Sequence, residues 1–165
     1  MCSTYTCDFR ELEVKAEFLE SAQWHFIGRV QKSNVSRLLK VKGLVMIETI
    51  DSIDTAAHVN QRCGVVMDVL VQVNITGEEQ KNGCAPEQVP EVLHFIKSEC
   101  KRLRLRGLMG IGKEGFPLLS ELYSTYKEVY DMDVLSMGMS ADYVEAIKYG
   151  ANNLRLGSCI FGARI

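Results

Sequence analysis

The 165-residue sequence contains few prolines and no long apolar run. Only 3 prolines occur, while 47% of the residues are hydrophobic, and this composition excludes intrinsic disorder. No apolar stretch approaches the roughly 18 residues that a membrane-spanning helix needs. Residues 1–8 have neither the basic start nor the apolar core of a secretory signal. The sequence therefore predicts a cytoplasmic protein with no membrane partner.

A strong charge of either sign is also absent. Lysine and arginine together number 19, and aspartate and glutamate number 21, which gives a net charge of -2 at pH 7. A slightly acidic chain is a poor candidate for nucleic-acid binding, which relies on a basic surface. The length is close to that of one domain, and we expect residues 1–165 to form a single one.

The patterns of common metal sites and nucleophiles are missing. The 6 cysteines are too sparse for a disulfide scaffold and include no Cys-x-x-Cys pair. No histidine stands at ligand spacing from a cysteine pair, so no metal site is expected. A Gly-x-Ser-x-Gly motif and a Cys–His signature are absent as well. Cys100 and Cys159 lie in apolar surroundings and are predicted to be small core residues.

The sequence does contain a regular alternation of strand-like and helix-like segments. The clearest strand, 66–74, has almost no polar face, which is typical of a parallel strand buried on both sides. The alternation predicts a parallel sheet with outer helices, either open or barrel-shaped. A complete eight-stranded barrel needs about 250 residues, so a complete barrel is not expected. The six predicted strands are 24–28, 44–50, 66–74, 103–111, 134–137 and 153–156.

Two stretches at the C-terminal ends of the last two strands suit a phosphate group. They are 136–140 (SMGMS), which runs into a predicted helix, and 155–158 (RLGS). Glycine lets the backbone approach an anion closely, and the N–H groups at a helix start point toward it. Ser140 and Ser158 add hydroxyl donors, and Arg155 adds a cation. The alternative is that the serines are ordinary turn residues and that Arg155 caps a strand end.

Two further features carry less weight. Residues 110–115 match Gly-x-Gly-x-x-Gly. This match comes late in the chain and is followed by Phe116 and Pro117, whereas a dinucleotide-binding motif belongs in the first strand–helix unit and opens a helix. His25 lies within a predicted strand, and we interpret it as a structural histidine rather than a catalytic base.

Seven segments resemble, in the same order, the pyridoxal phosphate homeostasis protein family. The resemblance covers residues 9–165, and seven ordered segments are far more specific than any single motif. The segments are 24–28 (WHFIG), 48–52 (ETIDS), 72–74 (QVN), 77–83 (GEEQKNG), 106–111 (RGLMGI), 136–142 (SMGMSAD) and 155–162 (RLGSCIFG).

The resemblance implies an α/β fold of the alanine racemase type, here an incomplete TIM-type barrel of about six parallel strands with outer helices. It also implies a non-catalytic carrier or buffer of pyridoxal 5′-phosphate (PLP). By the matching motifs, Ser140, Gly157 and Ser158 would hold the phosphate, and Arg155 would face the pyridine nitrogen. A cation there disfavours protonation of the nitrogen, and the ring becomes a weaker electron sink.

One family feature has no counterpart in this sequence. The family carries its imine-forming lysine on the first barrel strand, in a segment like Ala-Val-Ser-Lys-x-Lys-Pro, and nothing upstream of Trp24 resembles it. Three other lysines, Lys15, Lys32 and Lys113, fall on predicted helix faces or loops. Lys113 lies on the expected rim, that is, at the C-terminal ends of the strands. We therefore expect an N-terminally truncated barrel that binds PLP weakly and without a covalent link. Its exposed strand edges would favour self-association.

Two other functions stay open at this point. An amino-acid racemase needs an acid and a base on opposite faces of the ring, usually including the lysine, so the missing lysine strand argues against this activity. A structural or interaction protein without a ligand would instead use the exposed strand edges for association.

Overall fold

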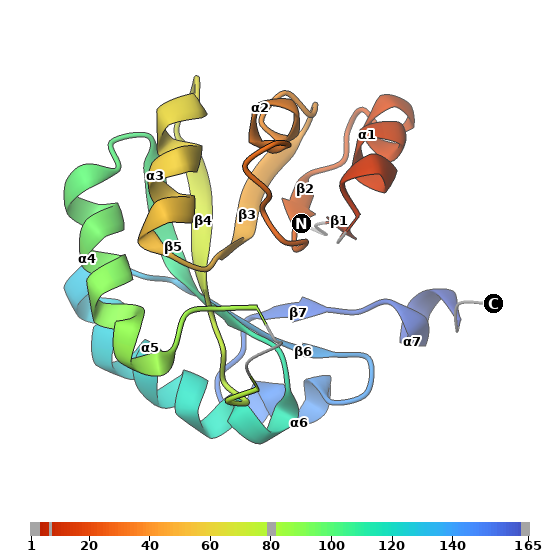
Figure 1. The fold of residues 1–165 in the computed structure, drawn as a ribbon. Helices are drawn as coiled ribbons and strands as arrows, with labels where there is room; N and C mark the ends of the chain where they lie inside the picture. Colours follow the sequence, from red (N-terminus) through yellow and green to blue (C-terminus); the bar gives the residue numbers. More distant parts are fainter. Residues whose placement is uncertain (1–3, 7, 79–81, 163–165) are drawn as a thin grey trace.

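The computed structural model describes residues 4–6, 8–78 and 82–162, whose strands form one curled parallel sheet (Figure 1). The strands stand in the sheet in the order in which they occur in the chain, and every neighbouring pair is parallel. They are β1 (Thr4–Thr6), β2 (Trp24–Phe26), β3 (Leu44–Ile50), β4 (Met67–Val73), β5 (Leu103–Gly110), β6 (Val134–Met139) and β7 (Asn153–Arg155).

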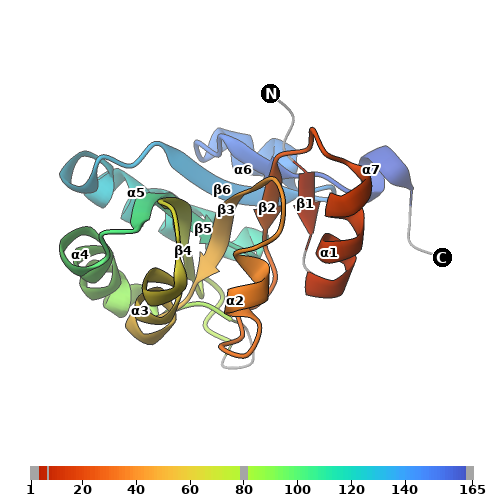
Figure 2. The same cartoon turned by 90° about the horizontal axis from the view of Figure 1, so that it is seen from above.

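Helices connect the strands and lie around the outside of the curled sheet (Figures 1 and 2). None of those described is both long and apolar enough to cross a membrane. They are α1 (Phe9–Phe18), α2 (Val35–Leu38), α3 (Ile53–Arg62), α4 (Val89–Glu99), α5 (Phe116–Tyr130), α6 (Tyr143–Lys148) and α7 (Ser158–Phe161), with short 3-10 turns η1 (Pro86–Gln88) and η2 (Lys113–Gly115).

The predicted incomplete α/β barrel is confirmed, with one short strand more than the six expected. β1 pairs in parallel with β2 through residues such as Tyr5, opposite His25. It escapes prediction because three residues are too few to show an alternating pattern. Within the described residues, β1 and β7 are the two ends of the sheet and do not pair with each other. Self-association through these edges stays a prediction.

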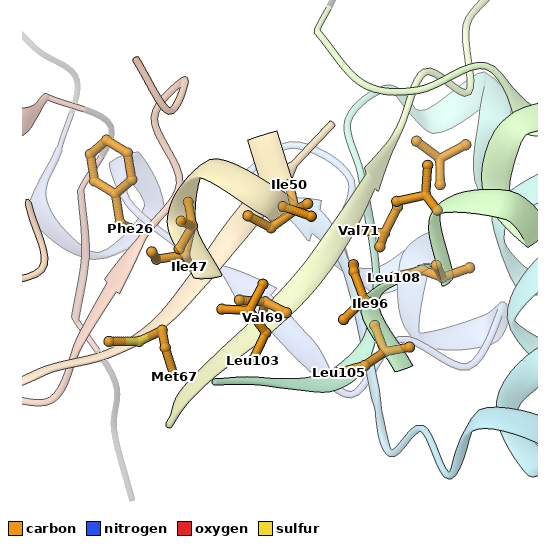
Figure 3. Packing of buried hydrophobic residues seen from close by; sticks show 14 of the residues in the cluster. Phe26, Ile47, Ile50, Met67, Val69, Val71, Ile96, Leu103, Leu105 and Leu108 are labelled. Carbon is orange, nitrogen blue, oxygen red and sulfur yellow. The ribbon is translucent and has the colours of Figure 1, made fainter. Parts of the chain in front are cut away.

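Apolar side chains fill the layer between the sheet and its helices. Ile47, Val69 and Leu108 project from three neighbouring strands and are fully buried, and Ile96 of α4 belongs to the same cluster (Figure 3). Burying one such side chain is worth about 1.5–3 kcal/mol. This outer layer is therefore the main apolar core, and it explains why the strands are apolar in sequence.

Glycine permits an unusually close approach of β5 and β6. A Cβ atom placed on Gly107 would lie only 1.7 Å from the carbonyl oxygen of Val134. Gly107 is paired with Val134 in the parallel register, and Met109 with Ser136 follows two residues later. Because glycine has no side chain to clash, the two strands can meet here, and the register brings Ser136 onto the inside of the curl.

Candidate functional site

The two stretches predicted to hold a phosphate meet at the C-terminal ends of β6 and β7. Met139, near the end of β6, pairs with Arg155 of β7. The next residue, Ser140, accepts hydrogen bonds at its Oγ from the backbone N–H groups of Gly157 (3.1 Å) and Cys159 (3.2 Å). Two N–H groups thus converge on one oxygen atom, and the structure brings Ser140 and the 157–159 turn together as the sequence predicts.

Local packing explains why the chain turns at this point. Gly138 has a positive φ of 94°, and a Cβ atom there would come within 2.6 Å of the Ala146 side chain. Glycine therefore lets α6 pack tightly over the end of β6. Asp142 closes the turn by accepting a hydrogen bond from the Met139 N–H (2.6 Å). The helix α6 begins at Tyr143, whereas the sequence predicts a helix directly after Ser140.

Arg155 lies inside the curl rather than at the surface. Its side chain is almost fully buried, with 7% of the residue exposed. One guanidinium nitrogen, Nη1, donates to the Ser136 hydroxyl at 2.7 Å, and Nη2 donates to the Gly110 carbonyl at 2.8 Å. Bonds to both β5 and β6 hold the guanidinium, so Arg155 is more than a cap on the end of its own strand.

The turn that carries Gly157 and Ser158 is open to solvent. Both residues are exposed, and Ser158 is the first residue of α7. Cys159 is also exposed, so the prediction that it belongs to the core is wrong: its apolar neighbours Ile160 and Phe161 are themselves exposed, at 63% and 85%. Cys100 is buried as predicted, and burial raises the pKa of its thiol.

A buried carboxylate, which the sequence analysis does not single out, lies at the centre of the inner face. Glu48 of β3 is fully buried. It is bonded to His25 Nδ1 (2.6 Å), the Ser136 hydroxyl (2.6 Å) and the Asn153 amide (3.0 Å). The prediction that His25 is an interior structural histidine agrees with this contact. The available signal in the sequence is a single acidic residue within a mostly apolar strand.

A second group of charges lies on the inner face nearer the start of the strands. Asp68 of β4 binds Arg104 through both carboxylate oxygens and also accepts from Arg106 Nη1 at 2.6 Å. Arg106 in turn binds Asp133, with Nε 2.7 Å from Oδ1. Hydrogen bonds from Arg106 hold the pKa of the Asp133 carboxyl below its ordinary value. These four residues neutralise one another.

A small cavity of about 280 Å³ lies between the Glu48 network and this charged group. Its lining includes His25, Met46, Arg106 and Asn153. Polar and apolar side chains share its wall, and Met46 belongs to a small inner cluster with Leu70 and Met109. The inside of the curl therefore combines a small apolar cluster with polar and charged side chains.

Among the described residues, no lysine side chain is buried on the inner face. The buried polar and charged residues there include none. Lys113, the rim lysine, lies in η2 with its Nζ 3.6 Å from Glu145 and with 56% of its side chain exposed. The residues 110–115 also do not open a long helix directly, since η2 intervenes before α5. The described residues contain no cluster of histidine, cysteine and acidic side chains that could hold a metal ion.

Comparison with known proteins defines the class first. The profile of the alanine racemase N-terminal domain matches residues 8–165. Among solved structures, an alanine racemase of Clostridium difficile superposes with a TM-score of 0.75 at 16% identity, over 97% of this chain and 47% of that one. PipY of Synechococcus elongatus with PLP bound gives a TM-score of 0.77 at 19% identity, over 96% of this chain and 80% of that one. These likenesses show the fold.

Similarity to curated relatives indicates the family within this fold class. The pyridoxal phosphate homeostasis protein of Homo sapiens is 41% identical in an alignment of 161 positions that covers 86% of this chain and 58% of the relative. That of Schizosaccharomyces pombe is 39% identical, over 94% of this chain and 71% of the relative. The chain belongs to the pyridoxal phosphate homeostasis protein family. It spans somewhat more than half of the human relative's length.

Proposed function

We propose that this chain binds pyridoxal 5′-phosphate non-covalently, as a non-catalytic carrier or buffer. The observation that carries the proposal is the convergence of the Gly157 and Cys159 N–H groups on the Ser140 oxygen, beside the buried Arg155. The family membership and the PLP-bound structure of PipY support it.

The rim has the donors that a phosphate needs. Backbone N–H groups aimed at one point are a common anion site in proteins, and here the Ser140 oxygen already occupies such a point. The hydroxyl of Ser158 stands on the same exposed turn. Ser140, Gly157 and Ser158 would hold the phosphate once the Ser140 hydroxyl turns from these N–H groups toward the ligand, which moves one side chain and leaves the core unchanged.

Arg155 would face the ring, and its charge bears on activity. When bound, PLP supplies an electron sink whose strength depends on a protonated ring nitrogen. The guanidinium stays charged at all relevant pH values and disfavours a proton on a nitrogen opposite to it. This arrangement favours storage of the cofactor over carbanion chemistry, and we propose that the chain is not an enzyme.

The absence of a buried lysine among the described residues supports non-covalent binding. A lysine that bonds a carbonyl carbon must first be desolvated so that its amine is neutral. The rim candidate Lys113 is exposed, with its Nζ 3.6 Å from Glu145, so it lacks the desolvated site that this chemistry requires. As far as the described residues go, binding would depend on phosphate and ring contacts, and we expect it to be weak and reversible.

Thermal unfolding of the 165-residue chain with increasing PLP tests the proposal. A ligand that binds the folded state stabilises it by about 2.7 kcal/mol at about 100 times its Kd, so the melting temperature should rise with concentration. The Ser140→Ala/Ser158→Ala double variant should lose most of this rise. Ser98→Ala, an exposed serine of α4 that bonds only its own helix, should keep it.

Three results would overturn the proposal in different ways. A melting temperature that PLP and inorganic phosphate both leave unchanged would show that the chain is no ligand carrier. A pyridoxyl-lysine peptide after borohydride reduction would show a covalent link. Racemisation of an amino acid by the PLP-loaded chain would show an enzyme.

A further inference from the structure

We infer that Glu48 is a positioning residue, which orients Arg155 through the Ser136 hydroxyl and so sets how the site recognises the cofactor ring. This inference rests on the proposed PLP binding. A single hydroxyl group links the carboxylate to Arg155. Ser136 Oγ is 2.6 Å from Glu48 Oε2 and 2.7 Å from Arg155 Nη1.

The burial of Glu48 needs a reason, because a carboxylate is costly to remove from water. An isolated buried charge costs several kcal/mol, and an apolar side chain of the same size often stabilises a protein as well or better. The neighbouring inner positions Met46 and Leu70 are apolar, so this part of the curl accepts apolar side chains. A carboxylate at position 48 therefore points to a role that an apolar side chain cannot fill.

The direction of each hydrogen bond follows from the chemistry of the groups. An ionised carboxylate only accepts, and a guanidinium only donates. The single hydroxyl hydrogen of Ser136 must then point to Glu48, which leaves the oxygen lone pairs for Arg155. The result is a polarised chain from cation to anion, Arg155 to Ser136 to Glu48, in which each bond strengthens the next.

The other ends of the chain are fixed as well. His25 and Asn153 both contact Glu48 Oε1, from β2 and β7 respectively. Arg155 donates its second nitrogen to the Gly110 carbonyl of β5. The plane of the guanidinium is therefore set before any ligand arrives, which reduces the entropy that binding must overcome.

Glu48→Gln is the sharpest variant, because it keeps the shape and removes the charge. The amide nitrogen of glutamine is a donor, so it would compete for the Ser136 oxygen with Arg155. In the ligand-free chain we expect the guanidinium NMR signals of Arg155 to be sharp and slowly exchanging, and to broaden in the variant. We expect PLP affinity to fall by about tenfold, the size of one oriented hydrogen bond to a charged group, while affinity for inorganic phosphate stays unchanged.

Asp68→Asn is the matched control. It also neutralises a carboxylate of the inner face, but Asp68 contacts Arg104 and Arg106 and not Arg155. The control should leave both the Arg155 signals and the ratio of PLP to phosphate affinity unchanged. If Glu48→Gln does not fold, Ser136→Ala interrupts the same chain while it keeps the carboxylate, and the same losses are expected.

The possible results separate this inference from the proposed function. Unchanged Arg155 signals and an unchanged affinity ratio in Glu48→Gln would overturn the positioning role. Equal losses of PLP and phosphate affinity would also overturn it, because they would indicate general damage to the site. If the wild-type chain binds neither ligand, the proposed function fails, and the guanidinium signals alone decide whether Glu48 holds Arg155.

Discussion

The outer face of the sheet, which meets the helices, and its inner face are made from alternate residues of the same strands. In β4, Val69 and Val71 join the outer apolar core, while Asp68 and Gln72 belong to the opposite face. The outer residues gain stability from buried area, which tolerates many apolar side chains. The inner residues make directed bonds whose partners are specific. The outer face thus holds the fold together, whereas the inner face carries the polar network that contains Arg155.

Truncation of an outer residue should have the largest effect on stability. Ile47→Ala removes a fully buried side chain of β3, and we expect the free energy of unfolding to fall by about 2–5 kcal/mol. Urea denaturation measures this loss. Val65→Ala, at a position that is 70% exposed, is the control and should change stability by no more than about 0.5 kcal/mol. Comparable losses in the two variants would mean that the outer layer is not the main core.

Removal of a polar group from the inner face should lower the free energy of unfolding by less than removal of an outer apolar side chain. Ser136→Ala deprives both Glu48 and Arg155 of a partner, and we expect a loss of about 1–3 kcal/mol, the usual cost of leaving a buried polar group unsatisfied. The same urea experiment applies, with Ser98→Ala as the exposed control. A loss as small as that of the control would show that solvent readily replaces the hydroxyl, and the contrast between the two faces would then be weaker.

The smallest effect is expected from the charged group near the start of the strands. Because Arg106 lowers the pKa of Asp133 in the folded state, this pair stabilises the fold above the carboxyl's ordinary pKa of about 3.9. The contribution is lost as the pH falls through the lower, folded pKa. Asp133 is 59% exposed in its side chain, so Asp133→Asn should cost no more than about 1 kcal/mol at pH 7.

Urea denaturation at pH 7 and at about pH 2.5 tests the sign of this effect, since the ordinary pKa lies between the two. The difference between wild type and Asp133→Asn should shrink at the acidic pH. A difference that grows with acidity would contradict the lowered pKa.

Sequence reasoning found the elements whose signal is local. Strands such as β4 are rich in apolar residues over their whole length, and that pattern can be read without knowledge of the partner strands. The rim residues could also be predicted from the sequence. Ser140 and the turn at Gly157 follow strand ends, where parallel folds place their ligands. The structure brings these residues together, and their binding of a phosphate stays a proposal.

The parts that escaped prediction depend on distant residues. Glu48 is locally an acidic residue in an apolar strand, which gives no indication of partners 23, 88 and 105 positions away. β1 is visible only through its pairing with β2, since three residues carry no period. For Cys159, the local signal is misleading. Its apolar neighbours in sequence predict burial, but the turn at α7 leaves them exposed.

Strands that stand in chain order allow the sheet to grow one unit at a time during synthesis, each new strand joining the edge just formed. The hydrogen bonds around Glu48 cannot form when β3 joins the sheet, because Ser136 and Asn153 are translated long after β3. Until β6 and β7 arrive, the carboxylate stays hydrated. Arrival of these two strands both expels that water and completes the rim, so an intermediate stalled before β6 would be unable to capture ligand.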